Sequence, residues 1–243
     1  MQLFYTPDHA RVGDVIPYYE NGEFKLFYLK NWNPYFGSDK TYGWHLLTTK
    51  DLIHYESETA IGILGGTGCI IKVEGLYHLY YCVFEDQPQR QYVCHATSTD
   101  LTNWTKYPDE TFGPDESIYL LTDWRDPHVI WNEEEKCWWM ILCAQNQGNT
   151  KRRGCVGLCK SADLHHWTCC EPLYAPQSSM SAYECPDLFY MNGWWYLVFS
   201  QFTDRFQTLY RMSRSCNGPW IRPKTDSFDG RAFYAAKTCS DGE

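Results

Sequence analysis

Four stretches of the chain alternate between apolar or aromatic side chains and polar ones. They cover residues 24–29, 76–84, 137–143 and 194–202. A period of two residues is typical of β-strands, and no window keeps the spacing of three and four residues that an amphipathic helix needs. A tight turn precedes each stretch, and the turns at Asn21-Gly22 and Asn192-Gly193 carry the strongest short hairpin signal. The pattern predicts a nearly all-β protein built from hairpins.

A short motif recurs behind these stretches. Residues 49–55 (Thr-Lys-Asp-Leu-Ile-His-Tyr) are echoed at 98–104 and 161–167, and more loosely at 213–220. A repeat of about 50 residues that contains several short strands is typical of propeller blades. We therefore expect an all-β, five-bladed β-propeller whose fifth blade is incomplete. The expected arrangement is one domain over 1–243, with blades near 12–60, 61–110, 120–172, 180–222 and, in part, 229–243, in a chain that continues further at its C-terminus.

Composition narrows the class of protein. With 243 residues and 44% hydrophobic content, the chain can bury the core of a single domain. Its net charge of -9 argues against nucleic acid as a partner. No run approaches the roughly 20 apolar residues of a membrane helix, and the first seven residues do not resemble a secretory signal. We expect a cytoplasmic protein without a membrane partner; the oligomeric state stays open.

The twelve cysteines and the histidines are not expected to bind a metal. Cys155 and Cys159 come nearest to a zinc-binding spacing, but no second pair accompanies them. His165 and His166 lie in a copy of the repeated motif and are expected to be solvated. Cys185 is expected to pack in the interior. We expect cysteine thiols in a reducing compartment, and neither a metal nor a cofactor.

Three carboxylates share one offset from the predicted turns. Asp14 precedes Gly22 by 8 residues, Asp126 precedes Glu134 by 8, and Glu184 precedes Asn192 by 8. If the first strand of each blade lines the central channel, equal offsets predict equal depth. Acids gathered in one channel oppose one another's ionisation, so function explains them better than structure. Two carboxyls that flank a glycosidic bond can supply an acid and a base, and a third can bind hydroxyls.

Asp51, Asp100 and Asp163 lie in the repeated motif instead and are interpreted as ordinary turn residues. In the second blade, the position that corresponds to the three acids falls in the stretch 65–68 (Gly-Gly-Thr-Gly). These small residues are expected to leave room in the channel rather than to supply charge.

The motifs around the acids resemble those of glycoside hydrolase family 32, the invertases, fructanases and sucrose-6-phosphate hydrolases. Residues 124–127 (Trp-Arg-Asp-Pro) are similar to the Arg-Asp-Pro motif of that family, and residues 184–189 (Glu-Cys-Pro-Asp-Leu-Phe) match another of its motifs completely. Residues 233–238 (Phe-Tyr-Ala-Ala-Lys-Thr) are similar to the segment that opens the fifth blade of the family. Thr67-Gly68-Cys69 is similar to its Ser-Gly-Ser. The first motif of the family is reduced here to Gly13-Asp14-Val15-Ile16-Pro17, in which the acid remains and the two Asn residues do not.

The resemblance implies a role for each acid. Asp14 would be the nucleophile, Glu184 the acid/base, and Asp126, helped by Arg125, the group that stabilises the transition state. Retaining chemistry of this kind needs carboxyls about 5 to 5.5 Å apart, a protonated Glu184 and an ionised Asp14.

Further residues are candidates for sugar binding. Trp124 and Tyr183 adjoin the acids, and with Trp44 and Trp32 they could form a stacking platform for the sugar. Thr67 and Gly68 complete the predicted substrate-binding set.

The leading hypothesis is a retaining β-fructofuranosidase that cleaves sucrose, sucrose 6-phosphate or short fructo-oligosaccharides. Two alternatives stay open. One is an inverting arabinosidase or xylosidase like those of family 43; the other is a sugar-binding propeller without turnover.

Overall fold

The computed structural model describes residues 5–31, 43–56, 58–87, 89–148, 150–204 and 206–242. Within these ranges, fifteen strands form four antiparallel sheets, and in each sheet the strands follow the order of the chain. Helical structure in the described ranges is a single 3-10 turn, η2 (Pro108–Glu110). The alternating pattern of the sequence is therefore realised as hairpins, which confirms the all-β class.

The first two sheets come from the first half of the chain. The first sheet contains β1 (Val12–Glu20), β2 (Glu23–Lys30), β3 (Gly43–Thr49) and β4 (Thr59–Ala60). The second contains β5 (Gly68–Val73), β6 (Leu76–Asp86), β7 (Gln89–Ser98) and β8 (Thr105–Lys106).

The other two sheets follow after η2. The third contains β9 (Tyr119–Asn132), β10 (Cys137–Asn146), β11 (Gly154–Ser161) and β12 (Thr168–Tyr174). The fourth contains β13 (Tyr183–Met191), β14 (Trp194–Gln201) and β15 (Gln207–Ser213).

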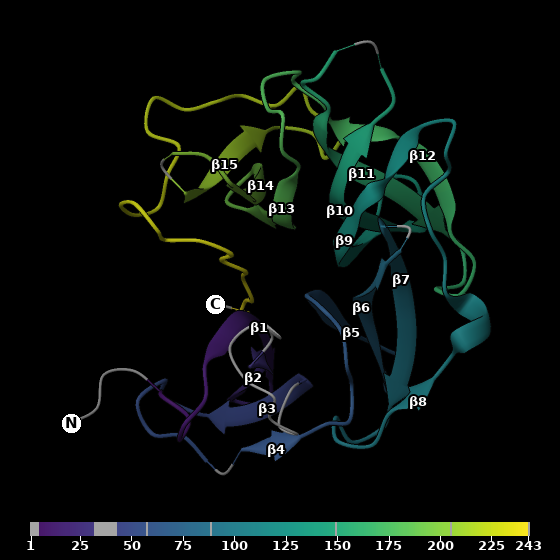
Figure 1. The fold of residues 1–243 in the computed structure, drawn as a ribbon. Coiled ribbons are helices and arrows are strands. Elements are labelled where there is room, and N and C mark those ends of the chain that lie inside the picture. The colour runs from purple at the N-terminus through teal and green to yellow at the C-terminus, as the bar shows by residue number, and fades with distance from the viewer. Residues whose placement is uncertain are drawn as a thin grey trace.

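The four sheets stand around a common centre, as blades of a β-propeller do (Figure 1). Their first strands contact one another in sequence, β1 with β5, β5 with β9, and β9 with β13. The C-terminal segment, drawn in yellow, runs from the fourth sheet towards β1 (Figure 1). The described residues after Ser213 form no further strand, so this structure shows four blades, and the partial fifth blade stays a prediction.

The hydrophobic core lies between neighbouring sheets. One cluster joins the first two sheets, through side chains such as Phe27 and Leu79. A second joins the second and third, through Tyr80 and Met140, and a third joins the third and fourth through Ile141. Because the second and third sheets each bury both faces against neighbouring sheets, packing fixes the positions of the first strands around the centre.

The repeated motif forms the turn after the third strand of the first three sheets. The hydroxyl of Ser98 accepts hydrogen bonds from the backbone N–H groups of Asp100 and Leu101, at 3.1 and 2.9 Å. The Asp100 carboxylate accepts from the N–H groups of Thr102 and Asn103. Equivalent bonds form in the turns that begin at residues 49 and 161. The turn role of these aspartates thus rests on hydrogen bonds within three residues.

No helix in the described part of the chain is long and apolar enough to cross a membrane.

Candidate active site

Three of the four first strands carry a β-bulge. The pairing of β1 with β2 shifts between Gly13 and Ile16, and that of β13 with β14 shifts between Glu184 and Asp187. The pairing of β9 with β10 shifts at Asp126 in the same way. Each bulge places one residue at positive φ: Asp14 at 31°, Asp126 at 56° and Cys185 at 48°. A non-glycine residue in this region is strained, and such strain concentrates at functional sites.

The bulges correct the register that the sequence predicted for Glu184. Asp14 lies six residues before the end of β1, and Asp126 lies six before the end of β9. Glu184 lies seven residues before the end of β13, so Cys185 occupies the position of the two aspartates. The structural equivalent of Glu184 in the third blade is Arg125, which also directly precedes its bulge. The equal offsets of 8 hide this difference, because Gly22 is the second residue of its turn and Asn192 is the first residue of its turn.

The first strand of the second blade differs from the other three. It pairs with β6 without a register shift. The glycines before it lie against that neighbouring strand: a Cβ on Gly65 would lie 2.6 Å from the Cys82 carbonyl oxygen, and one on Gly68 would lie 1.8 Å from that of Tyr80. The small residues thus allow a close approach of two backbones, rather than leaving open space in the channel.

Asp14 takes its main partner from this second blade. Its carboxylate accepts a hydrogen bond from the buried hydroxyl of Thr67. Burial raises the pKa of Asp14, the Thr67 hydrogen bond lowers it, and the nearby charge of Glu184 raises it again. Lys237 lowers the pKa of Asp14 as well, and its ammonium donates to the Pro186 carbonyl at 3.0 Å.

Asp126 is the most deeply buried of the three acids, with 5% of its surface exposed. It accepts a hydrogen bond from the Cys185 backbone N–H at 2.9 Å. Burial raises the pKa of Asp126 to about 6, although Arg125 opposes the shift; Glu184 and Asp14 add to it. Glu184 therefore lies close enough to raise the pKa of both aspartates, and Asp14 lies close enough to raise that of Asp126.

Glu184 lies between a cation and a phenol. Arg125 Nη2 donates to Glu184 Oε1 at 2.6 Å, and the Tyr234 hydroxyl donates to Oε2. The side chain of Glu184 remains 24% exposed, so a leaving group can reach it from solvent.

Arg125 is held by two further side chains. Its Nη1 donates to Gln91 Oε1 at 3.2 Å and to Asp123. Gln91 comes from β7 of the second blade and also accepts from the Trp124 N–H at 2.9 Å. Arg125 therefore joins the second, third and fourth blades at the centre of the molecule.

Cys185 lies between the two aspartates. Its N–H donates to Asp126, and its thiol lies 3.9 Å from Asp14 Oδ2. Burial raises the pKa of this thiol, followed by the charges of Asp126 and Asp14, so it stays protonated. Its place in the interior agrees with the sequence interpretation, with the added role of a donor.

Three of the four predicted aromatic platform residues are buried. Trp124 is fully buried and packs against Tyr119 in the cluster of the second and third sheets. Tyr183 packs against Phe199 in the next cluster, and Trp44 donates to the Gly66 carbonyl at 3.1 Å. Since none of these rings has an exposed face, the structure does not present them to a sugar. Trp32 lies outside the described residues.

Reasoning from the sequence missed four residues of this group, Gln91, Asp123, Tyr234 and Lys237. Tyr234 and Lys237 lie within the segment 233–238 that resembles the fifth-blade motif, and that motif was the available signal. Gln91 carried no signal, because it is 34 residues from the arginine that it holds. Asp123 is only 2 residues from Arg125 but lies just outside the motif at 124–127.

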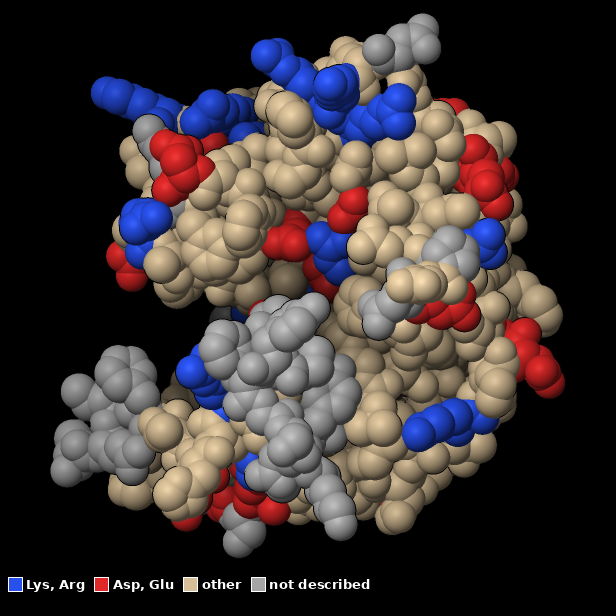
Figure 2. All heavy atoms as spheres, in the orientation of Figure 1, with Lys and Arg blue, Asp and Glu red and all other residues tan. Residues whose placement is uncertain are grey.

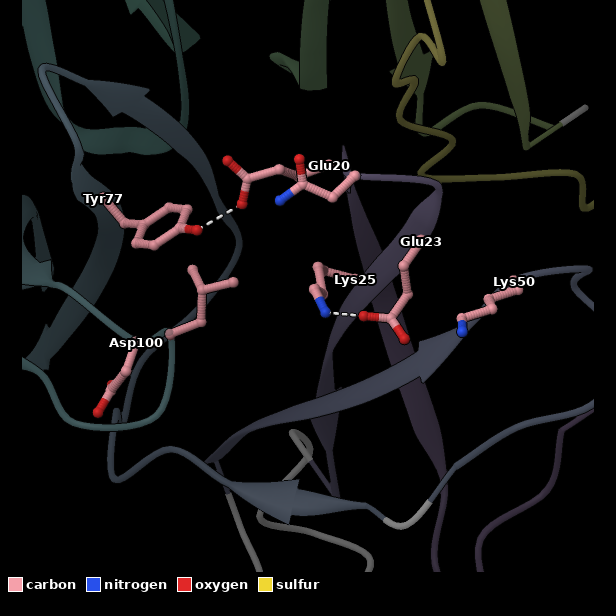
Figure 3. A pocket seen from close by; sticks show the side chains of 8 residues that line it. Glu20, Glu23, Lys25, Lys50, Tyr77 and Asp100 are labelled. Carbon is pink, nitrogen blue, oxygen red and sulfur yellow. Dashed lines mark hydrogen bonds and ion pairs between the residues drawn. The ribbon is translucent and has the colours of Figure 1, made fainter.

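A separate pocket of about 340 Å³ opens at the other end of β1. It lies at the β1–β2 turn, where Glu20 accepts from Tyr77 and Glu23 pairs with Lys25 (Figure 3). None of the three acids lines it. Because it contains none of the three acids, it is not a candidate for the same chemistry.

One face of the molecule has charge at its centre. Figure 2 shows acidic and basic side chains gathered in the hollow between the sheets. Three carboxyls and one arginine lie at or beside the bulges of β1, β9 and β13. Together they can supply a nucleophile, a proton donor and an acceptor for the hydroxyls of a sugar. A propeller with such a centre has the architecture and the groups of a glycoside hydrolase.

Sequence comparison identifies the family. The profile of the glycosyl hydrolases family 32 N-terminal domain matches residues 15–243. The chain therefore belongs to this family, as its motifs led us to expect. Asp14, which we assigned from the remnant of the first motif, directly precedes the matched range.

Several curated relatives share this similarity. A levanbiose-producing levanase of Bacillus subtilis (strain 168) is 26% identical over 258 residues, covering 97% of this chain and 45% of that protein. A sucrose-6-phosphate hydrolase of Escherichia coli is 30% identical over 174 residues, covering 65% of this chain and 34% of that protein. The chain spans about half the length, or less, of these relatives.

Solved structures support the fold. A family 32 β-fructofuranosidase of Bombyx mori superposes with a TM-score of 0.71 at 24% identity, covering 95% of this chain and 53% of that one. A levansucrase of Bacillus subtilis superposes with a TM-score of 0.69 at 14% identity, covering 89% of this chain and 71% of that one. These likenesses establish the propeller architecture.

Proposed function

We propose that the protein hydrolyses terminal β-fructofuranosides such as sucrose, sucrose 6-phosphate or short fructo-oligosaccharides. The observation that carries the proposal is that Asp14, Asp126 and Glu184 lie at the bulges of β1, β9 and β13. They are close enough for the charges of Glu184 and Asp14 to raise the pKa of Asp126. Membership of family 32 supports it, and so do relatives named as levanase and sucrose-6-phosphate hydrolase.

The reaction we propose is a double displacement that retains the anomeric configuration. Asp14 attacks the anomeric carbon of the fructosyl unit, while Glu184 gives its proton to the leaving oxygen. Glu184 then takes a proton from water, and the water oxygen displaces Asp14. Asp126, helped by Arg125, holds the fructosyl hydroxyls, and the Asp126 carboxylate stabilises the positive charge that develops on the ring.

Burial opposes the ionised form of Asp14 that attack requires, because it raises the pKa of that carboxyl. The Thr67 hydroxyl and Lys237 act in the opposite direction. We propose that these two residues keep enough of Asp14 ionised for attack, and that the Tyr234 hydroxyl orients Glu184 for proton transfer.

Product analysis tests the proposal. The purified protein is incubated with sucrose, sucrose 6-phosphate, kestose and inulin, and separately with aryl arabinosides and xylosides. We expect fructose release with retained configuration, seen by NMR before mutarotation, and its loss in Glu184→Gln. Cleavage of the pentosides alone, with inversion, would assign the family 43 type of activity. Fructoside binding that Asp14→Asn leaves intact, without turnover by the unaltered protein, would identify a binding module.

We also propose that residues 229–243 begin a fifth blade. The Thr208 N–H donates to the Phe233 carbonyl at 2.7 Å, and the Ala235 N–H donates to Ser200 Oγ at 2.8 Å. Thr238 donates twice to the Asp187 carboxylate, at 2.6 and 2.9 Å. These contacts hold the segment against the fourth sheet on its way to β1. Removing residues 229–243 should therefore lower the melting temperature and abolish turnover.

We propose the cytoplasm as the location. The support is that all twelve cysteines are free thiols, as in proteins of reducing compartments.

A further inference from the structure

Two histidines and a glutamate meet at the junction of the second and third blades, outside the bulges that carry the three acids. His95 lies on β7, Glu110 ends η2, and His165 lies in the turn between β11 and β12. Their ligand atoms all lie within 4.8 Å of one another. Residues 15 and 55 positions apart in the sequence thus form one compact group.

The Glu110 carboxylate lies between the two imidazoles. His95 Nδ1 is 2.5 Å from Oε2, and His165 Nδ1 is 2.8 Å from Oε1. Both rings therefore direct the same nitrogen, Nδ1, towards the carboxylate. Two imidazole nitrogens and a carboxylate oxygen are a donor set that zinc accepts.

A fourth residue, His78, fixes the inner imidazole. His78 Nδ1 lies 3.0 Å from His95 Nε2, and the two rings stack at 5.2 Å. A proton on His95 Nε2, donated to His78 Nδ1, leaves His95 Nδ1 with its lone pair free, as a metal ligand requires.

The group also has the accessibility that a metal site needs. His95 is 3% exposed and is stacked against Tyr80 at 4.6 Å. The His165 side chain is 37% exposed, which leaves an approach from solvent and a place for a water ligand. A buried, preoriented ligand together with an accessible one is the arrangement through which an ion can enter and be retained.

We propose that His95, Glu110 and His165 bind a Zn²⁺ ion that ties the second blade to the third. Each ligand comes from a different segment: β7, the connection between the two blades, and the β11–β12 turn. The ion would replace the contacts of Glu110 with both rings by three coordinate bonds, with water as the fourth ligand. This inference reverses the expectation, drawn from the sequence, that the chain binds no metal and that His165 is a solvated turn residue.

Adjacent histidines of one turn provide a matched pair of variants. His165→Ala removes a proposed ligand, whereas His166→Ala removes a side chain that is 89% exposed and contacts Asp163. The protein is first treated with a chelator and dialysed, and Zn²⁺ is then titrated by calorimetry. We expect one ion per chain for the unaltered protein and for His166→Ala, and an affinity at least about 100-fold lower for His165→Ala.

Cobalt reports the identity of the ligands. Co²⁺ should give visible d–d bands in the unaltered protein and in His166→Ala, without the thiolate charge-transfer bands of a cysteine site. The variant His78→Phe, which keeps all three ligands, should weaken Zn²⁺ binding by about 10-fold. Zinc should also raise the melting temperature of the unaltered protein, but not that of His165→Ala.

Three results would overturn the proposal. They are no zinc binding at millimolar concentration, equal binding by His165→Ala and His166→Ala, and cobalt spectra with thiolate bands. Circular dichroism of both alanine variants shows whether the fold is retained, so that loss of binding cannot be mistaken for unfolding.

Discussion

Two sets of aspartates recur along this chain, and their carboxylates face opposite environments. In the turns after the third strands, the N–H groups of the residues two and three positions later donate to Asp51, Asp100 and Asp163 and lower the pKa of each. On the first strands, burial raises the pKa of Asp14 and of Asp126. The same residue type thus stabilises the fold in one place and destabilises it in the other.

The two sets also differ in where their partners come from. The Asp100 partners lie within three residues of it. Asp14 takes its hydrogen bond from a residue 53 positions away, and Asp126 takes its own from one 59 positions away. A carboxylate that costs stability and depends on distant partners is retained for its chemistry, whereas a locally satisfied one is retained for the turn.

The largest effect should separate the two sets by activity. Asp14→Asn removes the proposed nucleophile, and we expect kcat on sucrose to fall by about 10⁴-fold. Asp51→Asn alters the turn aspartate of the same blade and should leave kcat within about 2-fold. The hydrogen-bond partners of Asp51 belong to the same turn: the N–H groups of Ile53 and His54 and the His54 ring. Steady-state kinetics with circular dichroism as a folding control decides. Equal losses in both variants would end the distinction.

The next effect concerns stability. Because the pKa of Asp126 is about 6 in the folded protein and near 3.8 in the unfolded chain, the folded state binds the proton more tightly. Its burial therefore costs nothing below pH 4, and the cost grows as the pH rises to 6 and is complete above it. Asp126→Asn, which keeps an oxygen for the Cys185 N–H, should gain up to about 3 kcal/mol at pH 7.5. Urea unfolding at pH 7.5 and at pH 4 measures this gain.

The control for this effect is the comparison at pH 4. There the variant and the unaltered protein should have the same stability, while turnover of the variant is low at either pH. A gain of the same size at pH 4 and pH 7.5 would mean that repacking, and not the charge, is responsible.

A smaller effect tests the distant partners. Tyr234→Phe removes the hydroxyl that donates to Glu184. A hydrogen bond to a charged group contributes about 1.5–3 kcal/mol, so kcat/KM should fall by about 10-fold or more. Tyr210→Phe is the matched control, since its hydroxyl donates to the Thr225 carbonyl instead. An unchanged kcat/KM in Tyr234→Phe would remove the tyrosine from the site.

The smallest effect should appear in the turn set alone. Asp100→Ala leaves the N–H groups of Thr102 and Asn103 without their carboxylate acceptor. Since both groups are exposed and water can replace it, the melting temperature should fall by only about 2 to 4 °C. Differential scanning calorimetry measures the shift, and kcat at 25 °C should not change. A loss of turnover would show that this turn affects the three acids at the centre of the propeller.

Much of the fold could be predicted from the sequence, because its signals are local. The turn at Asn21-Gly22 formed with both residues at positive φ, 53° and 78°, as a two-residue hairpin requires. The repeated motif formed its predicted turn in three blades. The depth of Glu184 was predicted less well, because a bulge adds a residue to the strand and shifts every position on one side of it. No count along the sequence reveals where that residue is added.

The sequence by itself determined the strands, the turns and the motifs that resemble family 32, because each depends on residues within a few positions of one another. The tertiary structure decided how those acids behave. Packing between blades buried Asp126 and brought Thr67 to Asp14 and Tyr234 to Glu184, and it closed Trp124 and Tyr183 off from solvent. It also brought His95 to His165, across residues that no spacing rule connects. Burial and long-range contact depend on how the sheets pack, so they appear only when the blades assemble.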